Sequence, residues 1–517
     1  MSTSIEQSSP PHDDKLDKGV LIIAGVVVLG AIMSILDITV VSVALQTFQQ
    51  EFDATSAQVA WTMTGYTLAL ASVIPLTGWA ADRFGTKRLY LMAVLLFTAG
   101  SVLCASASSL EMLVGFRVLQ GIGGGMLMPL GMTILTRAAG PERVGRVMAV
   151  LGIPMLLGPI FGPIIGGWLI DAASWHWIFL INLPIGLAAL VYAWIVLPKD
   201  HVEPSETFDW VGMLLLSPGL ALFLYGVSTT PETGTLWDRE VLVPALIGVA
   251  LIVAFVPWAL RERNIHPLVE LRLFKNRDMT VAVVAMALFA TAFFGASLLF
   301  PLYFQQVRGE DALSAGLLLA PQGIGAMITM PIAGILADRI GPGKIVIVGI
   351  GLITAGMAVF TQLTDTTSYA VLISALFVMG LGMGATMMPI MASALATLTA
   401  HNTARGSTLL NIVQQVAASL GTALFSVLLT NNIKDQPNGG AYLGLLQQMQ
   451  GLAGEQLAAA QAKLAQIMPK ALPELGEAYA DVFVVATILV AIVLIPAFML
   501  PRHKPDKPVD PTALAGH

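Results

Sequence analysis

Long apolar runs recur along the whole chain, and each is long enough to cross a membrane as a helix. About 20 such residues span a hydrocarbon core of about 30 Å. The chain of 517 residues is 56% hydrophobic and 11% charged, whereas soluble domains carry about 25% charged residues. A transmembrane barrel would instead show alternating segments of about ten residues. The sequence therefore predicts an all-α polytopic membrane protein.

The runs define fourteen expected spans. They cover roughly 19–45, 57–79, 88–108, 112–136, 144–170, 176–197, 209–228, 241–260, 279–304, 313–337, 343–363, 368–396, 407–430 and 479–499. The first run is too long for a signal-peptide core, so we expect a retained helix. The single cysteine, Cys104, lies within a run and leaves no internal disulfide or cysteine metal cluster.

The placement of basic residues tests this count. An even number of spans puts both termini on one side of the membrane. Of the 26 Lys and Arg residues, 20 then fall in loops and span ends on that side, 5 fall on the other, and Arg117 is left inside a span. The positive-inside rule places both termini in the cytoplasm.

An internal repeat divides the chain into two halves. The segment 78–87 reappears at 334–344, and 121–129 reappears at 380–389. Two similar halves predict two parallel six-helix bundles with a substrate path between them, and spans 7 and 8 become an insertion. The expected domains are a cytoplasmic tail 1–18, a bundle 19–197, a connector 198–278 with the two extra helices, a bundle 279–499 and a cytoplasmic tail 500–517. The second bundle includes an outer loop, 431–478, with a helical centre that either contacts the membrane surface or a partner, or packs as a cap.

Asp37 is an acidic residue well inside an apolar run. A carboxylate at the bilayer centre costs about 2.5–3.5 kcal/mol on insertion scales, so such residues are candidate functional sites. The alternative is a helix-end aspartate that only anchors or caps. Arg117 is the matching basic residue inside a span, and we expect the two to influence each other directly or through water.

The repeated loop motif predicts a conformational latch. Asp82 and Asp338 each follow a span end, where they could face the positive N-terminal end of a neighbouring helix. The alternative is a basic topology anchor with a turn glycine. The residues assigned to this motif are Gly78, Asp82, Arg83, Gly85, Asp338 and Arg339.

Span 5 carries a run of glycine and proline. These residues weaken helix regularity and allow close packing. We expect a pivot or proton seal at the interface of the two halves, or else an ordinary kinked helix. The residues are Gly158, Pro159, Gly162, Pro163, Gly166 and Gly167.

Polar and aromatic residues within spans are candidates for lining a substrate cavity. They are Trp61, Thr64, Tyr66, Gln305, Gln306, Asn411, Gln414 and Gln415. Only one of the seven histidines, His176, approaches a span, and we find no metal cluster or paired nucleophile and base. The sequence therefore predicts no enzyme, cofactor or metal site, and no nucleic-acid partner.

Together these motifs resemble the major facilitator superfamily, and within it the fourteen-helix drug:proton antiporter family of multidrug exporters. The resemblance rests on segments 36–45, 78–87, 158–167 and 175–186. Three positions depart from the family pattern: Ser42 replaces Asn, Gln46 replaces Pro and His176 replaces Arg. The resemblance implies that Asp37 couples transport to protons and that Arg117 modulates it.

The resemblance also implies that Asp82 latches the start of span 13, near Ser407, in the outward-open state, and that Asp338 does the same for span 5. We expect a monomeric antiporter in a bacterial inner (cytoplasmic) membrane, in contact with lipids and protons, that exports lipophilic drugs by alternating access. An exporter of one endogenous lipid, siderophore or metabolite is the alternative; the span 5 motif disfavours an importer. A partner that spans an outer envelope stays open.

Overall fold

The computed structural model describes residues 17–140, 143–199, 207–230, 235, 237–399, 402–449 and 454–502, and its regular elements there are helices without strands. The first half contains α1 (Lys18–Glu51), α2 (Ser56–Phe84), α3 (Thr86–Ala105), α4 (Leu110–Ala139), α5 (Val144–Ala172), α6 (Trp177–Leu180) and α7 (Asn182–Val196). The inserted pair is α8 (Trp210–Ser228) and α10 (Arg239–Ala259). The second half contains η2 (Leu271–Lys275), α11 (Arg277–Phe289), η3 (Ala290–Phe294), α12 (Leu299–Gln306), α13 (Ala312–Ile340), α14 (Pro342–Phe360), α15 (Tyr369–Gly384), α16 (Met387–Ala396), α17 (Thr403–Asp435), α18 (Pro437–Met449), α19 (Gly454–Ile492) and α20 (Leu494–Ala497).

Every expected span has a helical counterpart. In the described part of the chain, 13 helices are long and apolar enough to cross a membrane, and α5 adds a further helix of 29 residues. The predicted fold class, an all-α polytopic membrane protein, is therefore confirmed. Three spans that the sequence predicts as continuous contain a local irregularity instead, at the α6–α7 turn, at the π-helix η3 and at the α15–α16 turn.

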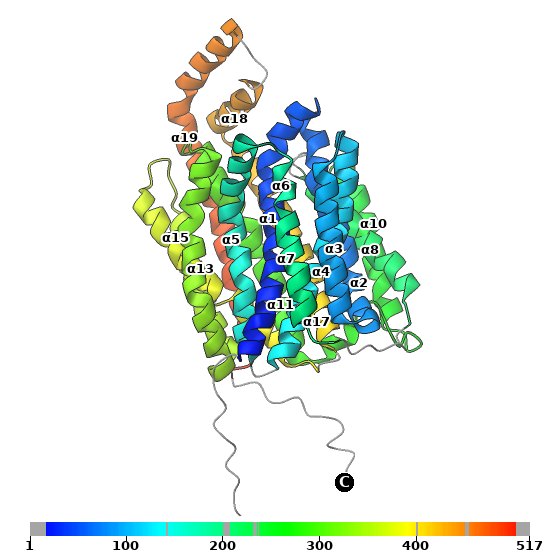
Figure 1. Cartoon of the computed structure of the whole chain (residues 1–517). Helices are drawn as coiled ribbons and strands as arrows, with labels where there is room; N and C mark the ends of the chain where they lie inside the picture. The colour runs from blue at the N-terminus through cyan, green and yellow to red at the C-terminus, as the bar shows by residue number, and fades with distance from the viewer. Residues whose placement is uncertain are drawn as a thin grey trace, which may run out of the picture.

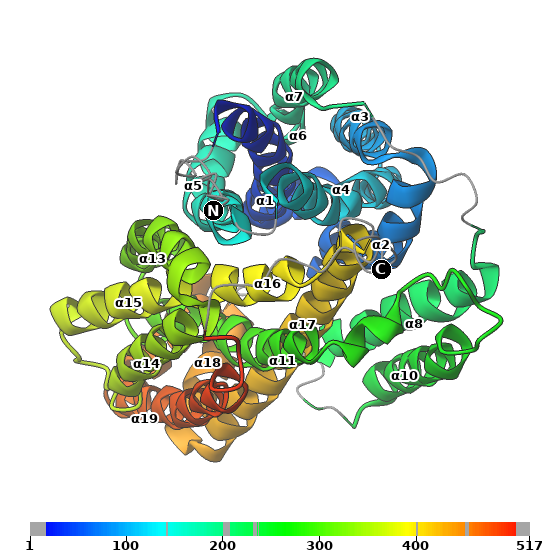
Figure 2. The same ribbon diagram turned by 90° about the horizontal axis from the view of Figure 1, so that it is seen from below.

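Two groups of helices stand side by side (Figure 2), and the inserted pair flanks both. Helices α1 to α7 form one group and α11 to α19 the other. Helices α8 and α10 pack against each other, and α8 also packs against α2 and α17. One helix from each half therefore contacts the insertion.

One end of the bundle, which we call the terminal face, holds both ends of the described chain. Asp17 pairs with Arg143 at the start of α5. Pro501 accepts a hydrogen bond from the backbone N–H of Gly343 in the first turn of α14. Helices α2 and α13 also end at this face, where α3 and α14 begin (Figure 1).

The repeated glycines have the same backbone geometry in both halves. Gly85 ends α2 at φ 91° and ψ 148°, and Gly341 ends α13 at φ 90° and ψ 143°. A residue with a Cβ atom is strained at such positive φ values, whereas glycine is not. The sequence repeat is therefore also a structural repeat that turns the chain sharply at the terminal face.

The segment expected as an outer loop is largely helical. Helix α18 and the first part of α19 project beyond the bundle on the side opposite the terminal face (Figure 1). Glu474 of α19 accepts hydrogen bonds from the backbone N–H groups of Asn438 and Gly439, at 2.8 and 2.9 Å, and ties the two helices together. Helix α19 continues without a break to Ile492, so the last helix begins well before the expected start of the span.

Candidate functional site

Asp37 lies in the middle of α1 and is 1% exposed. Its Oδ2 accepts a hydrogen bond from Nη1 of Arg117 at 2.5 Å. Its Oδ1 accepts from Nε2 of Gln120 at 2.7 Å and from Nδ2 of Asn182 at 3.3 Å. The sequence left open whether Asp37 and Arg117 meet directly or through water; the structure has a direct ion pair.

The Arg117 guanidinium is held from several sides. Its Nε donates to the backbone carbonyl of Thr62 at 3.0 Å, and its Nη1 donates to Oε1 of Gln120 at 2.7 Å. The ring of Tyr66 lies 4.2 Å from the guanidinium carbon, which is cation–π geometry. A buried ion pair repays its desolvation only when further hydrogen bonds satisfy both partners, and this pair meets that condition.

The polar cluster extends to two more helices. Ser101 of α3 accepts hydrogen bonds from Nε2 of Gln120 at 2.7 Å and from Nδ2 of Asn182 at 3.2 Å. Asn182 is the first residue of α7. The cluster therefore links α1, α2, α3, α4 and α7 in one buried hydrogen-bond network. Gln120 lies three residues after Arg117 and shares its helix face, which is a signal in the sequence. Asn182 belongs to the segment 175–186 that carries the family resemblance, whereas Ser101 has no local signal.

Glycines on α4 and α3 bring these helices close enough for the network to form. A Cβ atom on Gly121 would meet the backbone carbonyl oxygen of Tyr66 at 2.5 Å. A Cβ atom on Gly100 would meet the backbone and Cβ of Gln120 at 2.7–2.9 Å. The nearest atom that the added Cβ would meet is a backbone atom in each case, so a larger residue would push α2 or α3 away from the site.

Gly158 and Gly162 of the α5 glycine motif lie against α1, a helix of the same half. A Cβ atom on Gly158 would collide with Ile35, and one on Gly162 would collide with Thr39. Thr39 also donates to the carbonyl of Gly158 at 3.1 Å. The motif positions a helix of the same half next to the segment that carries Asp37. The side chains of Pro159 and Pro163 lie outside the described residues, and a Cβ atom on Gly167 would meet nothing within 4 Å.

Helix α5 also contacts the second half, and at the terminal face it does so through Asp338. Oδ1 of Asp338 accepts from the backbone N–H of Gly145 at 3.0 Å, and Oδ2 accepts from that of Arg146 at 3.3 Å. Arg146 adds a side-chain ion pair at 3.5 Å. Asp338 is 7% exposed and sits on the first turn of α5. A carboxylate here gains from the free N–H groups and positive end of the helix.

Asp82 contacts the first turn of α17 through the side chain of Arg405. Its Oδ2 lies 3.4 Å from Nε of Arg405, and its Oδ1 lies 3.4 Å from Nη2 of Arg137. Arg405 also pairs with Glu270 at 3.4 Å. From the family resemblance we expected a contact near Ser407. We gave no role to Arg405, Arg137 or Glu270, because ion pairs between distant segments leave no local pattern in the sequence.

The remaining motif residues lie around these contacts. Gly78 faces α17, because a Cβ atom there would meet Oγ1 of Thr408 at 3.1 Å and Cα of Arg405 at 3.4 Å. Arg83 is partly buried and Arg339 is exposed. Each follows an acidic residue whose carboxylate holds the opposite half of the bundle.

The expected cavity residues do not form one group. Trp61 stacks on Tyr225 of the inserted helix α8, at 5.6 Å between ring centroids. Tyr66 is buried in the polar cluster, where its hydroxyl lies 3.2 Å from that of Ser34. Gln306 accepts from the Tyr479 hydroxyl at 2.8 Å, near the end of α12 that is opposite the terminal face. These three residues therefore make packing or network contacts.

The other candidates come from both halves of the chain. Asn411 of α17 reaches the first half, where its Nδ2 lies 3.1 Å from the sulfur of Met132. Gln414 and Gln415, further along α17, are partly exposed, as is Thr64, and Gln305 is exposed. Within the described residues, no group of three or more His, Cys, Asp or Glu side chains could hold a metal ion.

Comparison with known proteins gives the family. Residues 27–422 match the profile of the Major Facilitator Superfamily. A multidrug resistance protein B homolog of Mycobacterium tuberculosis (strain ATCC 25618 / H37Rv) is 51% identical over 507 residues, covering 95% of this chain and 92% of the relative. The multidrug export protein EmrB of Haemophilus influenzae is 34% identical over 406 residues, covering 78% of this chain and 79% of its own length. The human organic anion transporter MFSD10 shares the fold, with a TM-score of 0.60 at 15% identity over 91% of this chain and 99% of that structure.

Proposed function

The chain belongs to the major facilitator superfamily, and from this premise we propose that it is a proton-coupled antiporter that exports lipophilic drugs or similar amphiphiles. It is a multi-pass membrane transporter and not an enzyme. Two similar relatives carry names that refer to multidrug resistance or multidrug export, which supports the substrate class. The basic residues near the terminal face support a cytoplasmic location for that face.

One observation carries the proton-coupling proposal: a buried carboxylate, Asp37, pairs directly with Arg117 and Gln120 of α4 and Asn182 of α7, and through Arg117 and Gln120 it belongs to a network that also includes α2 and α3. Protonation would remove the charge that Arg117 faces and one acceptor position of the network. Arg117 would then need another partner, since an unpaired buried cation is costly. A proton therefore changes the helix arrangement around α1, which is what coupling requires.

The contacts at the terminal face support an outward-facing arrangement. Asp338 holds the start of α5, and Asp82 holds the first turn of α17, so the halves are joined at this end. On α1, the exposed residues Ile38, Ser42 and Gln46 follow Asp37 at helical spacing towards the opposite face. This stripe is the proposed route by which a proton from outside reaches Asp37.

The driving force is sufficient for export. One charge moved through 100 mV yields about 2.3 kcal/mol. One proton exchanged for one neutral substrate then supports roughly fiftyfold accumulation from the membrane potential alone. Each chain supplies both halves, so the proposed transporting unit is a monomer.

The test is efflux of rhodamine 6G, a fluorescent lipophilic cation, from proteoliposomes with and without an imposed pH gradient. Asp37→Asn keeps the size of the side chain and removes the carboxylate that would take up the proton, so gradient-driven transport should fall at least tenfold while dye binding persists. Asp311→Asn is the matched control. Asp311 is exposed, caps α13, and hydrogen bonding from Ser314 keeps its pKa below the usual range; asparagine caps equally well.

Equal gradient-driven transport by Asp37→Asn and the parent would remove Asp37 from the coupling role. A parent protein that binds no dye and moves none would shift the substrate to a specific endogenous molecule. Lipid and metabolite analysis of cells with and without the protein would then identify that molecule.

A further inference from the structure

A pocket lies at the terminal face, where the inserted helix α8 begins and α10 ends, and the connector from α10 to η2 forms part of its wall. Its volume is about 460 Å³, which is within the size range of ligand pockets. The described lining residues are Thr207, Phe208, Asp209, Trp210, Val211, Trp258, Arg261, Arg263, Asn264 and His266. Basic and aromatic side chains therefore share this wall.

Asp209 is the one acidic residue among the described lining residues, and hydrogen bonds engage both oxygens of its carboxylate. Its Oδ1 accepts from Nε1 of Trp258 and from the backbone N–H of Gly212, each at 2.8 Å. Its Oδ2 accepts from the backbone N–H of Leu268 at 3.1 Å and from Nδ2 of Asn264 at 3.2 Å. This carboxylate therefore ties the connector to the start of α8 and fixes the shape of the pocket.

The two arginines of the pocket are exposed, and neither Arg261 nor Arg263 forms an ion pair within the described residues. The guanidinium carbon of Arg261 lies 5.3 Å from the ring centroid of Trp258, in cation–π geometry. Nη2 of Arg272 donates to the backbone carbonyls of Arg261 and Asn264, at 3.0 and 3.2 Å, and so holds the loop in place. Two guanidinium groups against one engaged carboxylate leave the described lining with a net positive charge.

Aromatic residues place the pocket at the boundary of the membrane. Trp210 is 65% exposed, and its ring makes a T-shaped contact with Phe208 at 4.5 Å between centroids. Phe208 in turn packs on Trp79 near the end of α2, at 4.4 Å. Tryptophan at span ends is typical of the level where lipid headgroups meet the hydrocarbon core. The arginines of the pocket therefore lie near the depth of lipid phosphate groups.

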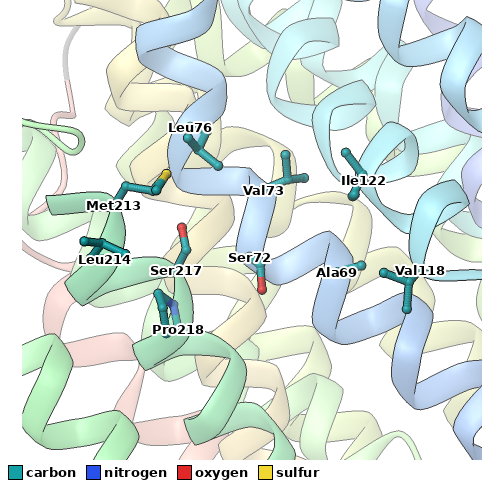
Figure 3. A pocket seen from close by; sticks show the side chains of 10 residues that line it. All are labelled: Ala69, Ser72, Val73, Leu76, Val118, Ile122, Met213, Leu214, Ser217 and Pro218. Atoms are coloured by element: carbon teal, nitrogen blue, oxygen red, sulfur yellow. The ribbon is translucent and has the colours of Figure 1, made fainter. Parts of the chain in front are cut away.

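The start of α8 offers an apolar surface next to the pocket. Val211, which lines the pocket, is 41% exposed, and Leu214, three residues later on the same side of the helix, is 62% exposed. Leu214 also lines the groove that α8 forms with α2 and α4 (Figure 3). On the connector, Ile265 is 69% exposed and follows Arg263 by two positions. Positive charge and exposed apolar surface thus adjoin at one place.

We propose that this pocket binds the headgroup of an anionic phospholipid of the surrounding membrane, such as phosphatidylglycerol. The phosphate accepts hydrogen bonds from the guanidinium groups of Arg261 and Arg263, whose planar geometry fits phosphate oxygens. The acyl chains cover the exposed apolar residues of α8. The net positive charge disfavours a lipophilic cation, and a soluble anion would leave the apolar surface bare. The inference depends neither on the proposed substrate nor on proton coupling, and it gives the inserted pair a lipid-binding role.

The test is native mass spectrometry of the full-length protein in detergent with added lipid. Dioleoylphosphatidylglycerol is compared with dioleoylphosphatidylcholine, which has the same acyl chains and no net charge. It is also compared with glycerophosphoglycerol, which is the same headgroup without acyl chains. We expect one phosphatidylglycerol per protein to bind about 25-fold more tightly than phosphatidylcholine, because each basic residue near an anionic lipid contributes about fivefold. Glycerophosphoglycerol should bind more weakly than the intact lipid, since it lacks the apolar contacts.

Substitutions in the pocket locate this lipid. Arg263→Gln should weaken phosphatidylglycerol binding about fivefold, and its combination with Arg261→Gln about 25-fold. Arg263→Lys keeps the positive charge and should lose less than Arg263→Gln. Arg263→Gln alone decides the question if loss of the contact between Arg261 and Trp258 destabilises the double variant.

Two controls separate this pocket from the general charge of the terminal face. Lys344→Gln combined with Arg502→Gln removes two exposed basic residues from the same face and should leave the tight site intact. Glu262→Gln removes an exposed acid that lies between the two arginines in the sequence, and it should not weaken binding. A thermal unfolding temperature within a degree or two of the parent shows that a variant is folded.

Equal binding of phosphatidylglycerol and phosphatidylcholine would overturn the proposal, because the arginines would then recognise no net charge. Equal losses in the pocket variants and in the matched double control would also overturn it, since the effect would belong to the whole face. Binding of glycerophosphoglycerol as tight as that of phosphatidylglycerol would assign the pocket to a soluble anion and would overturn the choice of a lipid.

Discussion

Asp338→Ala should shift the protein from the arrangement closed at the terminal face towards the one open there. The Asp338 carboxylate accepts two backbone hydrogen bonds from the start of α5 in the closed arrangement, and it is 7% exposed. Hydrogen bonds to a charged group contribute about 1.5–3 kcal/mol each. Water would satisfy the carboxylate once the halves separate, so the substitution destabilises only the closed arrangement.

The net magnitude is smaller than the sum of the two hydrogen bonds, because alanine also avoids the cost of burying a carboxylate. We expect a shift of about 3 kcal/mol, or roughly 150-fold in the equilibrium constant. A 99:1 preference for the closed arrangement would become roughly 2:3. Such a change is large enough to appear as a second population.

The assay is a spin–spin distance measurement in nanodiscs, with labels on Arg88→Cys and Lys344→Cys. These two exposed residues start α3 and α14, the equivalent helices of the two halves at the terminal face. The native Cys104 is buried, so the introduced cysteines take the label. Asp278→Ala is the control, because this acid lies in the first turn of its own helix, α11. A distance distribution identical to that of the parent in Asp338→Ala would refute the latch, and an equal shift in the control would show a general loss of stability.

Two further predictions concern packing and the buried pair. Arg117→Met leaves the Asp37 carboxylate buried without its cation, which should lower the free energy of unfolding by about 3–5 kcal/mol. Adding Asp37→Asn should restore most of the thermal stability but no gradient-driven transport. A double variant no more stable than Arg117→Met alone would contradict the pairing. Gly421→Val places a side chain against the backbone of Thr291 and should lower the unfolding temperature by several degrees. Gly444→Val is the control, because a Cβ atom on Gly444 would meet nothing within 4 Å, and it should leave the unfolding temperature unchanged. Equal effects of the two substitutions would contradict the packing argument.

The turns at the terminal face were predictable from the repeated sequence motif. The repeated motif placed an acidic residue before a turn glycine in each half, and Gly85 and Gly341 adopt the same positive φ. The target of Asp338 at the start of α5 follows the expectation taken from the family resemblance. The partners of Asp82, Arg137 and Arg405, lie 55 and 323 residues away in the chain, so the packed structure was needed to find them.

The sequence by itself determined the helical membrane fold, because span length and apolar composition are local properties of the chain. It also identified Asp37 and Arg117 as candidate site residues, because a charged residue inside an apolar run can be recognised without knowing its neighbours in space. Only the tertiary structure decided that Ser101 and Asn182 complete the network, and that the α5 glycines pack on α1. These outcomes depend on which helix faces meet, and that is set by close packing of residues far apart in the chain.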